Sequence, residues 1–378
     1  MLYAALGIQG KRICAWLVAL LVVLTAEAAG LRVSVLTPQM LRLEYSAAGF
    51  DEPLELVAGE GEVRHFEKDG FAFIETGRLT LRYLPEAEII PDAKDADVLR
   101  ISFRHANHNV IWYPGKDDAM NLLGTLPREV AGTNTADRNL LQKGLASRAG
   151  WTVVELAPTK DDSFDWLFLG YGYDYEQAVK DFQRFFPERI EQERTFHTSQ
   201  DLRIAPFLAA TAANVGTTYR GPSWDSTLTD DEGVIRWMQL SAFLPVEAYN
   251  TPDSVLEACF DSLEFGYAYR RAFQLQHSMQ TYCDSIQALG QALVRPLYYD
   301  FPVENNAYIY EDEFLVGHDI LVAPITRPAG EDGMARRSVW LPAGRWYDVV
   351  NHQHREGPLL LKMECGLSEV PYFKRITN

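Results

Sequence analysis

The chain has 378 residues, 47% of them hydrophobic, and carries a formal net charge of −17 at pH 7. This length predicts two or three domains with cores of their own. Because phosphate binding needs a basic surface, we expect no nucleic-acid partner.

The N-terminal segment, residues 1–29, has the composition of a secretory signal. Lys11 and Arg12 precede the apolar run 13–24, which is short for a membrane span, and the small residues Ala26 and Ala28 frame a cleavage site. We expect a cleaved signal peptide and a location outside the cell or in the endomembrane lumen. A retained signal anchor is the alternative, and only then do we expect contact with a membrane.

Short apolar strands separated by turns fill residues 31–172 and predict an N-terminal β-sandwich. The expected strands lie on either side of Pro38 and at 71–74, 79–83, 99–103, 110–112, 151–156 and 166–169. A long loop rich in Gly, Thr, Asn and Asp interrupts them between 121 and 151. Such a loop either faces a ligand or is a solvated excursion, and spacing does not decide between the two.

Helices dominate the expectation for residues 173–294. Asp174 caps the first helix, with Gln177 reaching back and Pro187 following its end. After the charged linker 188–198, helices are expected at 232–243, from a Thr251 cap onward and at 267–291. The helix at 232–243 places Val234, Trp237, Met238, Ser241 and Ala242 on one face. The last has Ala272, Phe273, Met279, Cys283 and Ile286 turned inward.

The segment 295–378 predicts a C-terminal β-sandwich. The apolar run 320–325 suits a buried strand, and the alternation at Val339 and Leu341 suits a half-buried one. We expect these two strands to be antiparallel and joined over a surface loop, with Pro342 to Gly344 forming a tight turn.

The remaining cysteines and polar clusters suggest little chemistry. Cys259, Cys283 and Cys365 are too few for a disulfide framework and allow one bridge at most. Cys283 is expected in the core, because nothing near it in sequence lowers a thiol pKa. The carboxylate pairs at 117–118, 161–162 and 230–231 are typical of solvated surfaces.

Neither a metal nor a cofactor is expected. His105 and His108, like His352 and His354, lack a third ligand at metal spacing. The sequence contains no phosphate-binding loop, nucleophile elbow or dinucleotide fingerprint.

A set of motifs nevertheless resembles glycoside hydrolase family 31, in the family's order. They are Leu123-Gly-Thr, Gly144-Leu-Ala-Ser-Arg, Gly170-Tyr-Gly-Tyr-Asp-Tyr, Ala209-Ala-Thr-Ala-Ala-Asn-Val-Gly216, Arg236-Trp-x-Gln-x-x-Ala-Phe-x-Pro245, Arg295-Pro-Leu-Tyr-Tyr-Asp-Phe-Pro302, Phe314-x-x-Gly-x-Asp-Ile-Leu-Val-Ala-Pro324 and Val339-x-Leu-Pro-x-Gly-x-Trp-Tyr-Asp348. The resemblance spans nearly the whole chain after Leu31.

The resemblance implies a retaining exo-α-glycosidase, most often an α-glucosidase or α-xylosidase. Its expected fold is mixed α and β and multidomain: an N-terminal β-sandwich at 31–172, a (β/α)₈ barrel and C-terminal β-domains. Here only a mostly helical remnant of the barrel is expected, at 173–294, followed by a truncated C-terminal β-sandwich at 295–378. We expect the remnant's residues 201–294 to collapse as helices.

The departure from the family lies where its chemistry should be. A complete barrel runs to about 250 residues, whereas a short charged linker here leads straight to Asp201. The segments that would carry the nucleophile and the acid/base are absent, so no catalytic residue is assigned. The resemblance leaves four candidate substrate-binding residues: Asp225, Asn250, Asn134 and Asp137.

Three hypotheses follow. The chain is an incomplete product of an α-glycosidase locus, a non-catalytic descendant that binds carbohydrate or a partner, or a structural protein. In the second, Trp112, Trp151 and Trp224 stack on sugar rings, although such aromatics commonly belong to a core. The expected ligands are α-linked glucosides or oligosaccharides.

Overall fold

The computed structural model describes residues 30–50, 62–123 (without 86), 143–189, 193–195, 218–220, 231–244, 246–247, 257 and 261–377. These residues form two compact units. The first comprises Met1–Phe103, Ile111–Gly115 and Glu155–Leu167, and the second comprises Arg104–Val110, Lys116–Val154 and Phe168–Asn378. The predicted boundaries at 172 and 294 stay predictions. No described helix is both long enough and apolar enough to cross a membrane.

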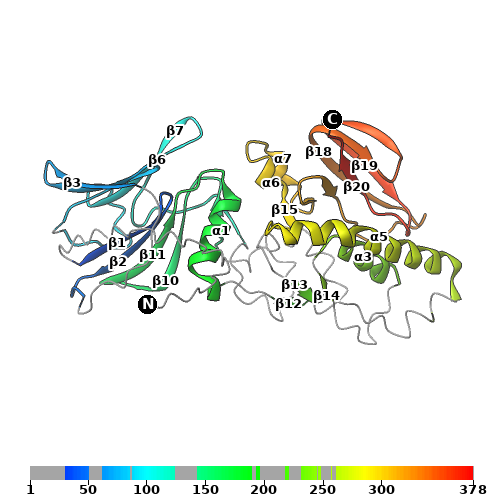
Figure 1. The fold of residues 1–378 in the computed structure, drawn as a ribbon, viewed down its shortest axis with the longest axis horizontal. Helices are drawn as coiled ribbons and strands as arrows, with labels where there is room; N and C mark the ends of the chain where they lie inside the picture. Colours follow the sequence, from blue (N-terminus) through cyan, green and yellow to red (C-terminus); the bar gives the residue numbers. More distant parts are fainter. Residues whose placement is uncertain are drawn as a thin grey trace, which may run out of the picture. The chain divides into compact units, whose positions relative to one another are not determined.

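Two sheets make up most of the first unit. The four-stranded sheet has the order β1-β2-β11-β10 and the five-stranded sheet the order β3-β4-β5-β6-β7; Figure 1 draws them as two layers. The strands are β1 (Leu31–Thr37), β2 (Met40–Ser46), β3 (Val63–Lys68), β4 (Phe71–Thr76), β5 (Leu79–Tyr83), β6 (Leu99–His105), β7 (His108–Trp112), β10 (Thr152–Lys160) and β11 (Ser163–Leu169). The expected strands are all present. β3 was missed because its side chains are mostly exposed and give no apolar alternation.

The turn at Pro38 sets the register of the first hairpin. Val33 lies opposite Leu43 and Val35 opposite Leu41, in antiparallel pairing. Alternate side chains therefore point to the same face, and Val33, Leu41 and Leu43 are buried there.

In the second unit, helix α1 (Tyr175–Phe185) follows the prediction closely. The Asp174 side chain accepts a hydrogen bond from the Gln177 backbone N at 3.4 Å, and Tyr175, Ala178 and Phe182 are buried. The Gln177 side chain does not reach back; its Nε2 donates to Asp181 Oδ1 at 3.0 Å. A short 3-10 helix, Pro187–Arg189, follows.

The described part of residues 201–294 is mostly helical, as expected, but it also contains short strands that the collapse into helices did not predict. β12 (Glu193–Thr195), β13 (Thr218–Arg220) and β14 (Val246–Glu247) form a parallel three-stranded sheet in chain order. The described helices there are α3 (Asp231–Ser241) and α5 (Leu263–Ala288), which Ser262 caps. The Thr251 cap lies outside the described residues.

Both helices differ from their predicted faces. α3 is buried on almost every side, because Ile235, Arg236, Gln239 and Leu240 are buried as well as the predicted face. In α5, Ala272, Met279, Cys283 and Ile286 are buried as expected, but Phe273 is 58% exposed. It lies about 80–140° around the helix from those residues, since each residue turns the helix by roughly 100°.

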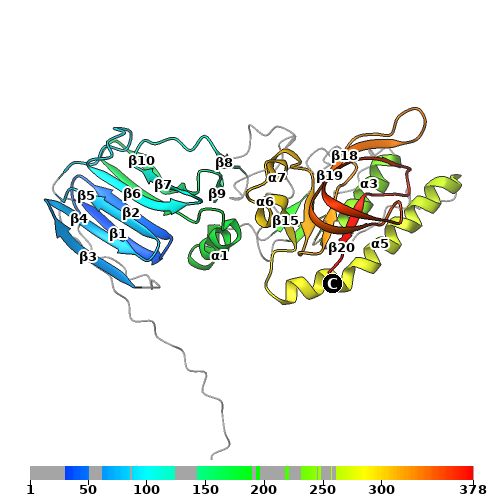
Figure 2. The ribbon, with the colours of Figure 1, turned by 90° about the horizontal axis from the view of Figure 1, so that it is seen from above.

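The C-terminal sheet has six strands in the order β15-β16-β17-β20-β18-β19. They are β15 (Val294–Pro296), β16 (Phe314–Val316), β17 (Ile320–Val322), β18 (Ala335–Asp348), β19 (Gln353–Cys365) and β20 (Tyr372–Arg375), with short helices α6 (Leu297–Asp300) and α7 (Asn306–Ile309). Residues of α3, α5, β16 and β17 share one apolar cluster. Figures 1 and 2 show both helices beside this sheet.

Two expectations for this sheet were wrong. β17 and β18 are not hydrogen-bonded neighbours, since β20 lies between them and pairs antiparallel with each. The two strands therefore run parallel. Pro342 to Gly344 is no turn: β18 continues through it with a register shift against β19, and the hairpin turn follows Asp348. The strand that separates β17 from β18 comes from the C-terminal end of the chain, which local spacing does not reveal.

The two described cysteines are buried and unpaired. Burial raises the pKa of Cys283 to about 11 and that of Cys365 to about 12. Cys283 is thus a core residue, as predicted, and neither thiol is poised for attack near neutral pH. Cys259 lies outside the described residues.

Candidate functional site

All four candidate substrate-binding residues, Asp225, Asn250, Asn134 and Asp137, lie outside the described residues. The described elements that lead into their segments make up the frame of the candidate site. These elements are the strand ends of β13 and β14 and the base of the loop between 123 and 143. All belong to the second unit.

The parallel strands fix where two of these segments begin. Tyr219 lies beside Val246 and Arg220 beside Glu247. The chain therefore leaves β13 and β14 at the same edge of the sheet. In parallel sheets this carboxyl edge is where ligand-binding loops collect.

A buried carboxylate holds the base of the long loop. β8 (Asn121–Leu122) pairs antiparallel with β9 (Ala146–Ser147). Asp118 accepts hydrogen bonds from Ser147 Oγ at 2.6 Å and Asn121 Nδ2 at 2.9 Å. Asn121 Oδ1 in turn accepts from the Gly144 backbone N at 2.7 Å. The two ends of the loop are thus joined through side chains.

The expectation that the pair at 117–118 is a solvated surface holds only for its first member. The Asp117 side chain is 76% exposed, with Lys143 Nζ at 3.7 Å, whereas Asp118 is buried. Burial raises the pKa of Asp118, and the Ser147 and Asn121 hydrogen bonds oppose that shift. Asn121 and Ser147, which satisfy the carboxylate, were not singled out from the sequence.

We expect Asp118→Ala to lower the free energy of unfolding by about 2 kcal/mol, because the hydroxyl of Ser147 and the amide of Asn121 lose a buried acceptor. Urea unfolding followed by circular dichroism measures this loss. Asp117→Ala removes the neighbouring exposed carboxylate and should stay within about 0.5 kcal/mol of wild type. Equal losses in both variants would show that Asp118 has no special part in the loop base.

His105 fills a tight site next to the same loop. Its ring lies 4.4 Å from the Tyr173 ring, centroid to centroid. A Cβ on Gly150, whose φ is +81°, would come within 2.6 Å of the imidazole, so this position requires glycine. Burial lowers the pKa of His105. No group of three or more His, Cys, Asp or Glu side chains suited to a metal occurs among the described residues.

A buried arginine ties α1 to the C-terminal sheet. Arg295 Nη1 donates to Glu176 Oε2 at 2.8 Å, and its Nη2 donates to Asp300 Oδ1 at 2.7 Å. Burial opposes the charge of Arg295, but Asp300 and Glu176 outweigh it and raise the pKa. His318 Nδ1 lies 3.0 Å from the second oxygen of Asp300.

The buried carboxylates serve structure. Asp181 accepts from Tyr171 Oη at 2.6 Å, Glu313 accepts from the Trp340 backbone N at 3.0 Å, and Asp348 accepts from the Asn351 backbone N at 3.0 Å. Like Asp118, each is satisfied by the chain's own donors.

Two of the three tryptophans considered for sugar stacking lie among the described residues, and both are buried. Trp112 and Trp151 are only 2% and 4% exposed. They are core residues, as the alternative interpretation had it, and offer no ring face to a sugar. Trp224 lies outside the described residues.

Comparison with known proteins identifies the C-terminal part directly. Residues 290–376 match the family model described as the glycosyl hydrolase family 31 C-terminal domain. The chain is 33% identical over 159 residues to the SITS-binding protein of Tetronarce californica, a match that covers 41% of this chain and 22% of that protein. It is 29% identical over 154 residues to alpha-glucosidase 2 of Bacillus thermoamyloliquefaciens, covering 38% and 19%.

A solved structure extends the likeness in fold. The crystal structure of a GH31 alpha-xylosidase from a soil metagenome, complexed with xylose, superposes with a TM-score of 0.50 at 11% identity, covering 92% of this chain and 97% of that one. The family model and these relatives support membership of glycosyl hydrolase family 31, with a partial chain. It matches about a fifth of the length of the curated relatives named above.

Proposed function

We propose that the chain derives from a retaining exo-α-glycosidase that releases terminal α-glucosyl or α-xylosyl units, and that this polypeptide does not itself catalyse the reaction. Retention needs two carboxyl groups about 5–5.5 Å apart, one as nucleophile and one as acid/base. In this fold both stand at the carboxyl ends of barrel strands.

The observation that carries the proposal is the short connection from α1 to the parallel sheet. α1 ends at Phe185 and β12 begins at Glu193. A complete barrel places several strands and helices in this interval. The parallel pairing of β12, β13 and β14 in chain order is what a piece of such a barrel retains, which supports descent from one.

We further propose that the carboxyl edge of β13 and β14 is the remnant of the substrate site. Asp225 follows β13 and Asn250 follows β14 in the sequence, so the topology starts both segments from one edge. Asn134 and Asp137, on the loop that Asp118 anchors, are the other proposed sugar contacts. The proposed ligands are α-linked glucosides or oligosaccharides.

Hydrolysis assays test the catalytic part. Purified full-length chain is expected to give no release of nitrophenol from p-nitrophenyl α-glucoside or α-xyloside above that of a buffer control. A complete family 31 enzyme at the same concentration is the positive control. Turnover by this chain that survives further purification would refute the proposal.

Carbohydrate binding without catalysis is the second candidate, favoured by the retained parallel edge. Calorimetry with maltose, isomaltose and xylobiose is expected to detect binding in the millimolar range, as for small ligands with few contacts. Asp225→Ala and Asn250→Ala should abolish it. Absence of heat with every sugar would remove this candidate and leave a structural role.

The genomic interval between the codons for Phe186 and Asp201 separates an incomplete product from a true loss. An open, homologous exon there favours incompleteness, and its absence favours loss.

We also propose entry into the secretory route through residues 1–29, with membrane contact only if that segment is retained. Fractionation of expressing cells, with the N-terminus sequenced, tests this route.

A further inference from the structure

Helix α3 carries a row of polar side chains in an otherwise apolar setting. Glu232, Arg236 and Gln239 follow one another at helical spacing and so share a face of the helix. The side chains of Arg236 and Glu232 are 2% and 22% exposed, and Gln239 is buried. A buried charge of this kind is costly unless partners satisfy it.

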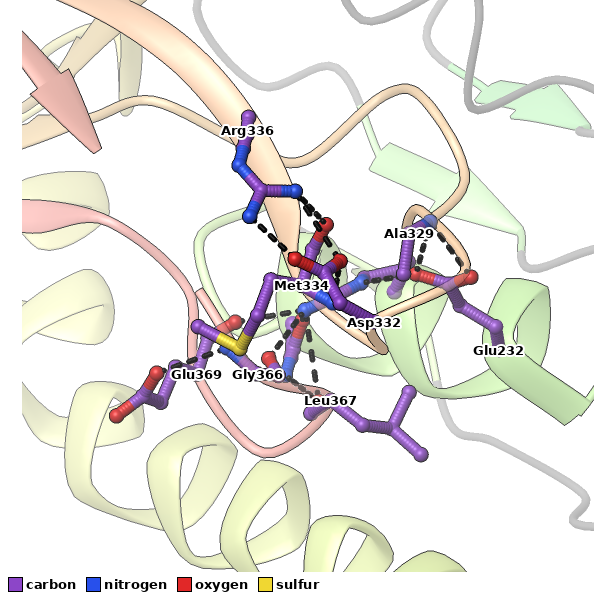
Figure 3. Close-up of polar contacts among 10 residues, drawn as sticks. Glu232, Ala329, Asp332, Met334, Arg336, Gly366, Leu367 and Glu369 are labelled. Atoms are coloured by element: carbon purple, nitrogen blue, oxygen red, sulfur yellow. Dashed lines mark hydrogen bonds and ion pairs between the residues drawn. The ribbon is translucent and has the colours of Figure 1, made fainter. Parts of the chain in front are cut away.

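Arg236 and Gln239 bind the loop between β19 and β20. Arg236 Nη1 donates to the carbonyl oxygens of Glu369 at 2.7 Å and Gly366 at 3.1 Å. Gln239 Nε2 donates to the carbonyl oxygen of Leu367 at 2.8 Å, and its Oε1 accepts from Arg236 Nη1 at 3.2 Å. Figure 3 shows Gly366, Leu367 and Glu369 gathered at this contact.

Glu232 binds a second loop, the one between β17 and β18. Its two carboxylate oxygens accept from the Ala329 backbone N at 2.9 and 3.1 Å, as Figure 3 shows. The same carboxylate accepts from Arg236 Nε at 3.2 Å. One face of α3 therefore holds two separate loops of the C-terminal sheet.

These contacts supply hydrogen-bond partners for backbone groups of the two loops. Backbone groups inside a domain need partners, and strands usually provide them. Here a helix earlier in the chain satisfies one N–H and three carbonyl groups of the loops. Residues of α3 also belong to the apolar cluster of β16 and β17.

We propose that Glu232, Arg236 and Gln239 form a polar clamp that makes α3 one cooperative unit with the C-terminal sheet and positions the start of β14. α3 ends at Ser241, shortly before β14. In this role Arg236 is a positioning residue. The clamp itself does not depend on any ligand. An effect of Arg236 on ligand binding rests on the proposed glycoside site beyond β14.

Hydrogen exchange read by mass spectrometry tests the clamp on the full chain, without any ligand. In wild type, the amides of α3 should exchange as slowly as those of the β18–β19 hairpin. In Arg236→Met they should exchange about 100-fold faster, since a buried partner is lost, while the hairpin keeps its protection. Unchanged exchange in α3, or an equal loss in the hairpin, would overturn the proposal.

Arg336→Met is the matched control. Arg336 lies on β18 and pairs with Asp332 and Glu364, but its side chain is 50% exposed. Its loss should change exchange in α3 by less than about twofold. Should Arg236→Met fail to fold, Gln239→Ala removes the hydrogen bonds to Leu367 and Arg236 but keeps the Arg236 cation. About 10-fold faster exchange is then expected, confined to α3 and residues 366–369.

Sugar binding separates the two proposals. If wild type binds maltose and folded Gln239→Ala binds it at least 5-fold more weakly, α3 positions the site. If both bind equally, the positioning role is wrong even though the clamp stands. If wild type binds no sugar, the glycoside site is wrong, and the exchange experiment alone decides on the clamp.

Discussion

Replacing Trp346 with alanine is expected to lower the free energy of unfolding by about 3–5 kcal/mol. The indole is fully buried among residues of the C-terminal sheet. Its Nε1 donates to the Pro342 carbonyl oxygen at 2.9 Å, and the Arg375 guanidinium lies 4.9 Å from the ring centroid. Truncation leaves a cavity, removes the hydrogen bond to the Pro342 carbonyl oxygen and takes away the nearer of two aromatic rings beside Arg375.

Urea unfolding monitored by tryptophan fluorescence and circular dichroism measures this loss. Leu360→Ala is the matched control, because Leu360 lies on the adjacent strand β19 but is 55% exposed. It should cost no more than about 0.5 kcal/mol. A loss in Trp346→Ala no larger than the loss in Leu360→Ala would contradict the observed packing of β18.

Arg295→Met is expected to cost about 3–5 kcal/mol at neutral pH. The substitution keeps much of the apolar stem but leaves Glu176 and Asp300 without their shared cation. Arg336→Met removes an arginine from exposed ion pairs and should cost no more than about 1 kcal/mol. Equal losses would mean that the Arg295 network contributes no more than a surface pair.

Acid should shrink the difference between wild type and Arg295→Met. Burial raises the pKa of Glu176, but hydrogen bonds from Lys180 and Arg295 outweigh it and lower the pKa below its usual 4.5. A lowered carboxyl pKa stabilises the folded state above pH 4.5, and this stability is lost as the pH falls through the lowered value. The difference in the free energy of unfolding between wild type and Arg295→Met should therefore be smaller at pH 3.5 than at pH 7. A larger difference at pH 3.5 would contradict this assignment.

Sequence patterns predicted the elements that are determined by residues close together in the chain. The cap at Asp174 and the strands on either side of Pro38 depend on neighbours in sequence, and both are confirmed. β20 separates β17 from β18, and no pattern within 320–348 indicates that a distant strand pairs between them. Spacing also misplaced Phe273, which was predicted to face inward but lies on a different side of α5 from the buried residues Met279 and Cys283.

The roles of the polar residues were harder to predict from the sequence. Asp118 is adjacent to an exposed aspartate in sequence, and only its tertiary partners Ser147 and Asn121 distinguish it. Arg236 belongs to a motif of the family, yet its partners are backbone groups over a hundred positions away in the chain. Sequence motifs therefore indicated the family, while the role of each polar residue required the fold.

Covalent labelling tests the central claim, that this chain has lost the nucleophile of a retaining α-glycosidase. Retaining enzymes form a glycosyl ester on a carboxylate. A fluorinated glucosyl fluoride makes that ester long-lived enough for its mass to be measured. Intact-mass spectrometry of the chain after incubation with such a reagent should show no added mass, while a complete family 31 enzyme treated alongside gains one glycosyl unit. A stoichiometric adduct on an aspartate of this chain would contradict the claim.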